Sequence, residues 1–160
     1  MTDKNEDIYE AWGAFFVTHA LAVKQIEERL AGHVPLSLDE YDVLLAIDRS
    51  MIGRVRFSEL ADRAVCTRSG ITRMIKRLED RGFIGRVSCE HDRRGVFAVL
   101  TGEGKSAMKD TWRRYSKEIG ELFGAAFTAS EARELKGLME KVLKVIQGPE
   151  LIKIAGRKRS

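Results

Sequence analysis

The sequence of 160 residues is poor in the residue types that build disulfide frameworks and metal centres. Its two cysteines, Cys66 and Cys89, are too isolated for a disulfide framework or a thiolate metal site. No apolar run approaches the roughly 20 residues that a membrane-spanning helix needs. The polar first residues resemble neither a secretory signal nor a transit peptide. We therefore expect a cytosolic chain that folds as one domain or as two small lobes.

Motifs typical of enzymes are also lacking. The sequence contains no His-Glu-x-x-His pair, no phosphate-binding glycine loop and no Gly-x-Ser-x-Gly turn. Its three histidines, His19, His33 and His91, are scattered and have no clustered carboxylates beside them. We interpret His19 as a core or pocket residue, and His91 as an exposed residue or a neighbour of phosphate. The sequence thus predicts no catalytic activity, no cofactor and no metal site.

The positive charge is concentrated in two segments, although the net charge is only +4. Residues 54–94 contain eleven basic and six acidic side chains, and ten of the eleven basic ones are arginine. Residues 153–160 add four basic side chains and no acid, which leaves a net charge of −5 for the remainder. Because the arginine side chain suits phosphate and guanine, this asymmetry favours a polyanionic partner.

The spacing of apolar residues predicts a mainly helical chain with one short β element. The expected helices cover residues 7–31, 38–50, a short stretch after Ser58, 68–81, 102–126 and 129–147. The expected strands run from Phe83 to Cys89 and from Val96 to Leu100, with a polar tip over residues 90–95 between them.

Two capping boxes and an apolar seam add detail to these helices. Ser37 with Glu40, and Thr128 with Glu131, have the spacing in which each side chain satisfies a backbone donor of the other residue. Apolar residues in the helix over 102–126 follow alternating steps of four and three, which is typical of a coiled-coil seam. They are Met108, Trp112, Tyr115, Ile119, Leu122 and Ala126. We expect a second copy of the chain to cover this seam and the apolar stripes of the first and last helices.

The helix over 68–81 has two opposite faces when successive residues are turned by about 100°. Its apolar arc contains Ile71, Met74, Ile75 and Leu78. The opposite arc contains Ser69, Arg73, Lys76 and Arg77, flanked by Arg68 and Thr72. We expect the apolar arc to pack on Leu60 and Ala64, so that the polar arc faces outward as in a recognition helix of the DNA major groove. The order of helices, turn and hairpin predicts a winged helix-turn-helix.

Four motifs in this region resemble the MarR family of bacterial transcription regulators. They are ELADR at residues 59–63, RSGITRMIKRLEDRGFI at 68–84, DRRG at 92–95 and LTGEG at 100–104. The resemblance is continuous over about 57–105. It implies a mainly α fold in which a winged helix-turn-helix over 37–101, with a two-stranded β wing, is flanked by dimerisation helices. These helices lie in residues 1–36 and 102–148, and a basic tail follows over 149–160.

The resemblance also implies a function. Family members bind a pseudo-palindromic DNA site as homodimers, and usually repress until a small aromatic acid binds or a cysteine is oxidised. The implied DNA contacts, in which Asp92 orients Arg94 into the minor groove, are Arg68, Ser69, Thr72, Arg73, Lys76, Arg77, Asp92, Arg93 and Arg94. The candidate effector residues are Trp12, Phe16, His19 and Arg49. Cysteine sensing fits less well, because residues 7–31 contain no cysteine. We interpret Cys66 as a core residue and Cys89 as an ordinary strand residue.

Two other binding functions are compatible with the same pattern. A helical scaffold could hold a protein partner through its winged lobe. A basic lobe could bind RNA, although a recognition helix enters the deep, narrow major groove of A-form RNA poorly. The salt dependence of binding distinguishes a DNA partner from a protein partner. For DNA, the logarithm of the association constant falls with log[salt] with a slope of about 0.9 per neutralised phosphate.

Overall fold

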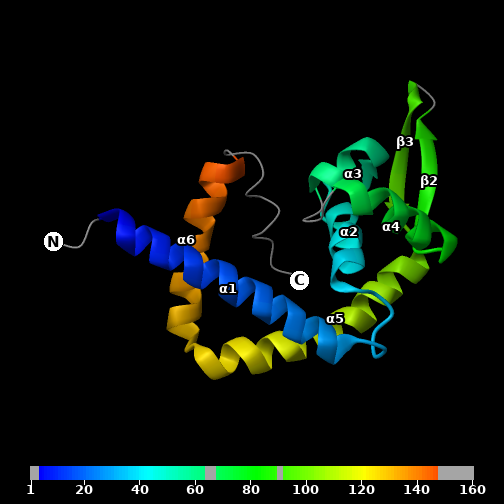
Figure 1. Cartoon of the computed structure of the whole chain (residues 1–160). Coiled ribbons are helices and arrows are strands. Elements are labelled where there is room, and N and C mark those ends of the chain that lie inside the picture. Colours follow the sequence, from blue (N-terminus) through cyan, green and yellow to red (C-terminus); the bar gives the residue numbers. More distant parts are fainter. Residues whose placement is uncertain (1–3, 64–67, 90–91, 148–160) are drawn as a thin grey trace. The chain divides into compact units, whose positions relative to one another are not determined.

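The computed structural model describes residues 4–63, 68–89 and 92–147 and is shown in Figure 1. Its elements in chain order are α1 (Lys4–Leu30), α2 (Leu38–Asp48), β1 (Arg54–Arg56), α3 (Phe57–Arg63), α4 (Arg68–Asp80), β2 (Ile84–Cys89), β3 (Asp92–Leu100), α5 (Gly102–Ala126) and α6 (Ala129–Gln147). The chain divides inside α5 into two compact units, residues 1–118 and 119–160, which are described separately. The predicted mainly helical fold is confirmed. In the described residues, no helix is both long enough and apolar enough to span a membrane.

Local sequence signals set the boundary between α1 and α2. Gly32 follows α1 with a φ of 73°, a left-handed conformation that glycine adopts without steric strain. The Ser37 backbone N–H donates to Glu40 Oε2, and the Glu40 backbone N–H donates to Ser37 Oγ, both at 3.2 Å. This reciprocal pair is the predicted capping box, and α2 begins one residue after Ser37.

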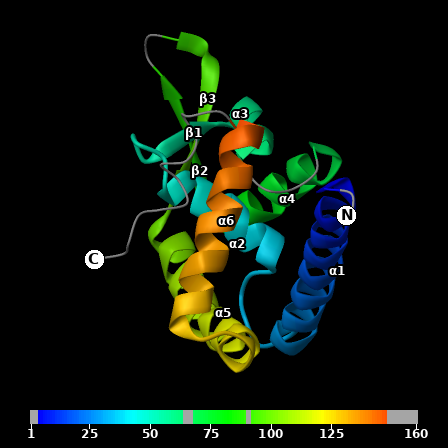
Figure 2. The ribbon, with the colours of Figure 1, turned by 90° about the vertical axis from the view of Figure 1, so that its left-hand side faces the viewer.

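The strands form one antiparallel sheet in the order β1-β3-β2. The hairpin of β2 and β3 is the predicted wing, and it projects from the lobe in Figures 1 and 2. The sequence does not predict β1, because its three residues are too few to show an alternating pattern. Val55 of β1 pairs with Ala98 of β3, and both are fully buried, so β1 closes the base of the wing against the core.

The winged lobe packs around one apolar core within the first unit. Every residue of the predicted apolar arc of α4 is buried: Ile71, Met74, Ile75 and Leu78. Leu44 from α2 and Leu60 from α3 are completely buried in the same cluster. The predicted core face of α4 is therefore confirmed, whereas Ala64, its second expected partner, lies outside the described residues.

A tight turn connects α4 to the wing. Gly82 has a φ of 72°, and the Phe83 N–H donates to the Leu78 carbonyl at 2.9 Å, as in a Schellman motif. Thr101 then joins the turn to α5. Its hydroxyl donates to the Gly82 carbonyl at 2.7 Å and accepts from the Gly104 N–H at 3.0 Å. One threonine thus caps α5 and holds the turn before β2.

The second unit contains the end of α5 and all of α6. The Thr128 N–H donates to Glu131 Oε2 at 2.8 Å, and the Glu131 N–H donates to Thr128 Oγ at 3.3 Å, so the second predicted capping box is confirmed. Hydrogen bonds from the Thr128 side chain and backbone hold the pKa of Glu131 below its ordinary value. The predicted basic tail lies outside the described residues.

Candidate nucleic-acid interface

The outward face of α4 presents polar side chains to solvent. Thr72, Arg73, Lys76 and Arg77 are all exposed, opposite the buried arc. Arg68 and Ser69 lie in the first turn of the helix, and the positions of their side chains are outside the described ones. A helix that exposes hydroxyl and cationic groups over two turns has the width and the donors that a DNA major groove accepts.

A buried carboxylate on α2 anchors the far end of α4. Glu40 Oε1 lies 3.4 Å from Arg77 Nη2, and Glu40 Oε2 accepts from Arg81 Nη1 at 3.1 Å. Arg81 also donates to the Pro35 carbonyl. Only 8% of the Glu40 side chain is exposed, against 61% for Arg77. The carboxylate is therefore part of the lobe's interior, while Arg77 still reaches solvent, where we expect it to meet phosphate.

A second ion pair ties the wing to α4. Arg86 of β2 makes a two-pronged contact with Glu79, in which Nη2 donates to Oε2 at 2.7 Å and Nε donates to Oε1. The Arg86 guanidinium also lies 4.6 Å from the centre of the Phe57 ring. The hydrogen bond from Arg86 is the main cause that holds the pKa of Glu79 below its ordinary value. Arg86 thus holds the base of the wing against α4. The sequence does not predict this role, because the charge of residues 54–94 does not distinguish one cation from another.

The tip of the wing is shorter than predicted. The polar tip was expected to cover residues 90–95, but β3 already begins at Asp92, which pairs with Cys89. Polar residues can join a strand because its pairing uses backbone groups. A register shift between Ser88 and Cys89 leaves residues 93–95 as extra residues in β3. The side chains of Asp92, Arg93 and Arg94 are outside the described ones, so their roles stay predictions.

The candidate effector residues of α1 belong to an exposed aromatic row. The ring centroids of Trp12 and Phe16 are 6.1 Å apart, and those of Phe15 and His19 are 6.0 Å apart. His19 is exposed, so its interpretation as a core residue is wrong. The reason is that burial on α1 is confined to its last turns, at Ile26 and Leu30 in the described part of the helix. A pocket role for His19 stays a prediction.

Arg49, the fourth candidate, lies at the end of α2. Its backbone N–H donates to the Leu45 carbonyl at 3.0 Å, and its side chain is exposed. Its guanidinium is close enough to Asp42 to lower the pKa of that carboxyl, although other causes outweigh it. In the described part of the chain, no ring contact or hydrogen bond given by the structure joins Arg49 to the aromatic row of α1.

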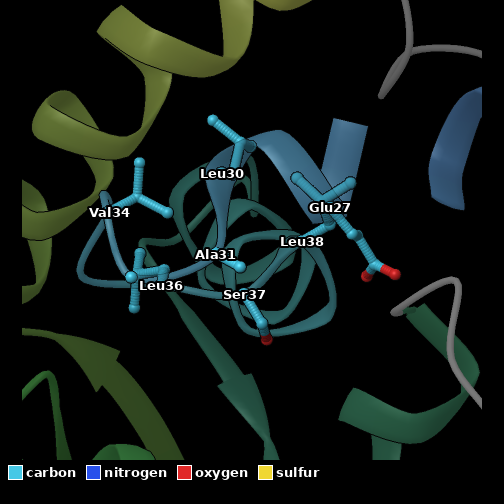
Figure 3. Close-up of a pocket in the computed structure, with 8 residues that line it drawn as sticks. Glu27, Leu30, Ala31, Val34, Leu36, Ser37 and Leu38 are labelled. Carbon is cyan, nitrogen blue, oxygen red and sulfur yellow. The ribbon is translucent and has the colours of Figure 1, made fainter. Parts of the chain in front are cut away.

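A hollow of about 260 Å³ lies between the end of α1 and the start of α2 (Figure 3). Leu30, Val34, Leu36 and Leu38 make its lining largely apolar. Figure 3 shows the Glu27 carboxylate pointing away from Val34. None of the four candidate effector residues lines this hollow, so it neither confirms nor excludes the predicted effector site.

An aromatic cluster joins α2 to α5 and was not predicted. The Tyr41 ring stacks on Trp112 at a centroid distance of 6.2 Å and meets the edge of Tyr115 at 6.0 Å. Met108, one turn earlier on α5, is buried. The first half of the predicted seam therefore contributes to the packing of the lobe itself. Burial raises the pKa of Tyr115, and the nearby Asp42 carboxylate adds to this.

Asp42 is expected to destabilise the fold at neutral pH. Burial raises its pKa above the ordinary value of 3.8, and the Asp39 carboxylate adds to the shift. When a carboxyl has a higher pKa in the folded than in the unfolded chain, the folded protein loses stability as the pH rises past the ordinary pKa of 3.8. We expect Asp42→Asn to raise the melting temperature at pH 7, with the gain disappearing below about pH 3.8. Thermal unfolding across this pH range measures it, and a variant less stable than wild type at pH 7 would contradict it.

Comparison with known proteins gives one consistent family. Residues 36–96 match the sequence model of the MarR family. The multiple antibiotic resistance protein MarR of Salmonella typhimurium is 28% identical over 125 residues, which cover 76% of this chain and 85% of that protein.

Solved structures agree with this result over nearly the whole chain. Sco3205, a MarR family transcriptional regulator from Streptomyces coelicolor solved in complex with DNA, is 25% identical with a TM-score of 0.75, covering 94% of this chain and 92% of that one. AbsC, a MarR family transcriptional regulator from the same organism, is 26% identical with a TM-score of 0.73, covering 93% and 99%.

Proposed function

Because the chain belongs to the MarR family of DNA-binding transcription regulators, we propose that it recognises a specific double-stranded DNA sequence with α4 and the wing. The observation that carries this proposal is the two-faced α4. Its apolar arc is buried in the core, while Thr72, Arg73 and Lys76 face solvent. The DNA complex of Sco3205 supports the same use of this fold here.

Selection of bound sequences from random duplex DNA tests the proposal directly. We expect enrichment of two similar half-sites in inverted orientation, with centres about one helical turn apart, because a symmetric dimer reads a symmetric operator. The affinity for the enriched duplex should fall steeply as salt is added. Failure to enrich any sequence, together with binding that salt leaves unchanged, would favour the protein-scaffold function instead.

Arg73 and Arg77 are expected to play different roles on α4. Arg73 lies near the start of the outward face, where we propose that it meets base edges, so Arg73→Ala should lose about 1–3 kcal/mol of discrimination between operator and random DNA. Arg77→Ala should weaken both DNAs about equally, as loss of a phosphate contact does. Titrations of each variant against both DNAs at one salt concentration measure the difference. Equal losses on operator and random DNA for Arg73→Ala would refute its role in base reading.

At the wing, we propose that Asp92 orients Arg94 into the minor groove. An arginine at a hairpin tip loses rotamer freedom on entering a narrow groove, and a carboxylate bonded to it can fix its direction beforehand. Arg94→Ala should weaken operator binding with little change in melting temperature. Asp92→Ala should weaken it too, although removal of a negative charge favours DNA by simple electrostatics. If Asp92→Ala binds the operator as tightly as wild type, Asp92 does not orient Arg94. The wing would then act only as a cationic patch in which Arg93 and Arg94 contact phosphate.

We further propose that the protein is a homodimer with two-fold symmetry. Two helices expose large apolar side chains: Trp12 and Phe16 on α1 are about 60% exposed, and Val145 and Ile146 on α6 are more exposed still. Exposed apolar area of this kind marks an interface. Light scattering should report twice the mass of the chain at micromolar concentration, and a monomer there would overturn the proposal.

Repression and its release complete the proposed function. We propose that the protein acts in the cytoplasm, where its operator lies, and that a small aromatic acid lowers its affinity for DNA. Linkage requires that operator DNA weaken the binding of that acid by the same factor. A broad panel of aromatic acids, tested by competition against labelled operator, should contain at least one that shifts the affinity. If none does, the effector part of the proposal fails while DNA recognition stands.

A further inference from the structure

A hollow at the end of α1 is lined mainly by cations. It lies between the last residues of α1 and the middle of α5, belongs entirely to the first unit and has a volume of about 320 Å³. Its lining residues are Arg29, Leu30, His33, Arg113, Arg114, Lys117 and Glu118. Four of these seven are arginine or lysine, and one is acidic. The hollow therefore has an excess of positive charge.

Helix geometry explains how the cations gather on one wall. Successive residues of an α-helix turn by about 100°, so Arg113, Arg114 and Lys117 fall within a single arc of about 100° on α5. Arg29 and His33 line the hollow from the end of α1 and the residues that follow it. Cations from two separate segments thus surround one concave space.

Part of this charge is already used in the fold. Arg29 Nη1 lies 3.1 Å from Glu118 Oε2, and Arg29 also occupies the last turn of α1, where a positive charge complements the helix dipole. Arg113 and Arg114 differ, because within the described ranges their guanidinium groups have no ion-pair partner. Like charges three or four positions apart on a helix repel and reduce stability, and Lys117 has this spacing from Arg114 and Arg113. Folding alone therefore does not account for this group of cations.

We propose that this hollow binds a small anion that carries two or more phosphate groups. Two guanidinium forks and a lysine ammonium provide the charge-assisted donors that phosphate oxygens prefer. A concave space of about 320 Å³ suits a compact ligand rather than a duplex. Figures 1 and 2 both place the end of α1 and this part of α5 at the opposite end of the first unit from the projecting hairpin. None of its lining residues belongs to α4, β2 or β3, so the hollow is separate from the surface proposed for DNA.

Calorimetric titration of the full chain with inorganic pyrophosphate, at low ionic strength and without DNA, tests the site. We expect Arg113→Ala/Arg114→Ala to bind pyrophosphate at least about tenfold more weakly than wild type, since two charge-assisted contacts are lost. Alanine is a good helix former, so α5 should remain folded, and thermal unfolding confirms it. The matched control, Arg133→Ala/Lys141→Ala, removes two exposed cations of α6 outside the hollow and should bind like wild type.

A variant that removes a negative charge from the hollow provides a second test. Glu118→Gln removes the one carboxylate among the seven lining residues, so it should bind pyrophosphate more tightly than wild type. Orthophosphate, with one phosphate group, should bind more weakly than pyrophosphate. The proposal is overturned if wild type does not bind pyrophosphate, or if the Arg113/Arg114 double variant binds it as tightly as wild type. It is also overturned if the control pair loses as much affinity as the double variant.

Phosphates of DNA are the other source of this chemistry, and a second measurement separates them from a free anion. We expect the Arg113/Arg114 double variant to bind duplex DNA within about twofold of wild type, with an unchanged salt slope. The opposite result would be a lower DNA affinity and a plot of log K against log[salt] whose slope is shallower by about 1–2. It would show that the hollow binds the DNA backbone, and would overturn the proposal of a free anion as its ligand. Because pyrophosphate binding is measured without DNA, its outcome does not depend on the proposed operator recognition.

Discussion

Gly104→Ala is expected to lower the free energy of unfolding by about 3 kcal/mol, at the upper end of what overpacking costs. A Cβ atom at this position would lie 2.2 Å from the Phe83 carbonyl oxygen and 2.9 Å from Leu100 Cδ1. The oxygen cannot move away freely, because the Thr101 N–H donates to it at 3.2 Å. Gly104 therefore allows the start of α5 to touch the turn that leads into the wing.

Thermal and urea unfolding measure this effect, and Gly102→Ala provides the matched control. Gly102 lies two residues earlier on α5, and a Cβ there would meet nothing within 4 Å. Both changes gain the helix propensity of alanine over glycine, at most about 1 kcal/mol. We expect Gly102→Ala to be neutral or slightly stabilising, and Gly104→Ala to melt about 10 °C below wild type. Equal stability of the two variants would show that the contact with Phe83 relaxes without cost.

Glu40→Ala is expected to cost about 2 kcal/mol of stability and to weaken operator binding. Its side chain accepts the Ser37 N–H in the capping box, worth about 1 kcal/mol. It also meets Arg77 and Arg81, whose contributions are reduced because 61% and 40% of these side chains are exposed. Removal of the carboxylate makes the lobe more positive, which by itself favours DNA. A weaker affinity for operator would therefore show that Glu40 acts by holding α4 in position.

Two further variants separate the cap from the ion pairs. Ser37→Ala removes the hydroxyl that accepts the Glu40 N–H but leaves the Glu40 carboxylate and its arginine contacts, so it should lose stability without losing operator affinity in the folded protein. Glu40→Gln keeps an N3 side chain able to accept the Ser37 N–H but loses the charge, so it should lose operator affinity. A double-mutant cycle with Arg81→Gln should show a coupling of about 0.5–1 kcal/mol in the free energy of unfolding. Zero coupling, together with unchanged DNA binding by Glu40→Gln, would show that Glu40 does not hold α4 in position for DNA binding.

The boundaries and faces of the helices are largely readable from the sequence. Both capping boxes, the stop at Gly82 and the buried arc of α4 follow from residues within one or two turns of each other. Such signals are local or periodic, so they do not depend on how distant segments meet. β1 escapes prediction because three residues carry no period, and its position is decided by pairing with β3.

The candidate interface could be predicted only as a list of residue types. The sequence predicts an outward polar face on α4, and the exposure of Thr72, Arg73 and Lys76 confirms it. It does not distinguish cations that face solvent from those that brace the lobe. Arg86 is in the second group, because its pair with Glu79 and its contact with Phe57 depend on the packing of β2 against two helices.

The sequence by itself determined the helical class, the two-faced α4, the caps and the family likeness, since all of these are encoded in short segments or in one period. Only the tertiary structure decided which side chains meet across long separations. Glu40 reaches Arg81 over 41 positions, Arg29 reaches Glu118 over 89, and the space needed at Gly104 is set by Phe83. Such contacts arise because packed elements leave fixed gaps and charges between them, and no local pattern specifies those gaps.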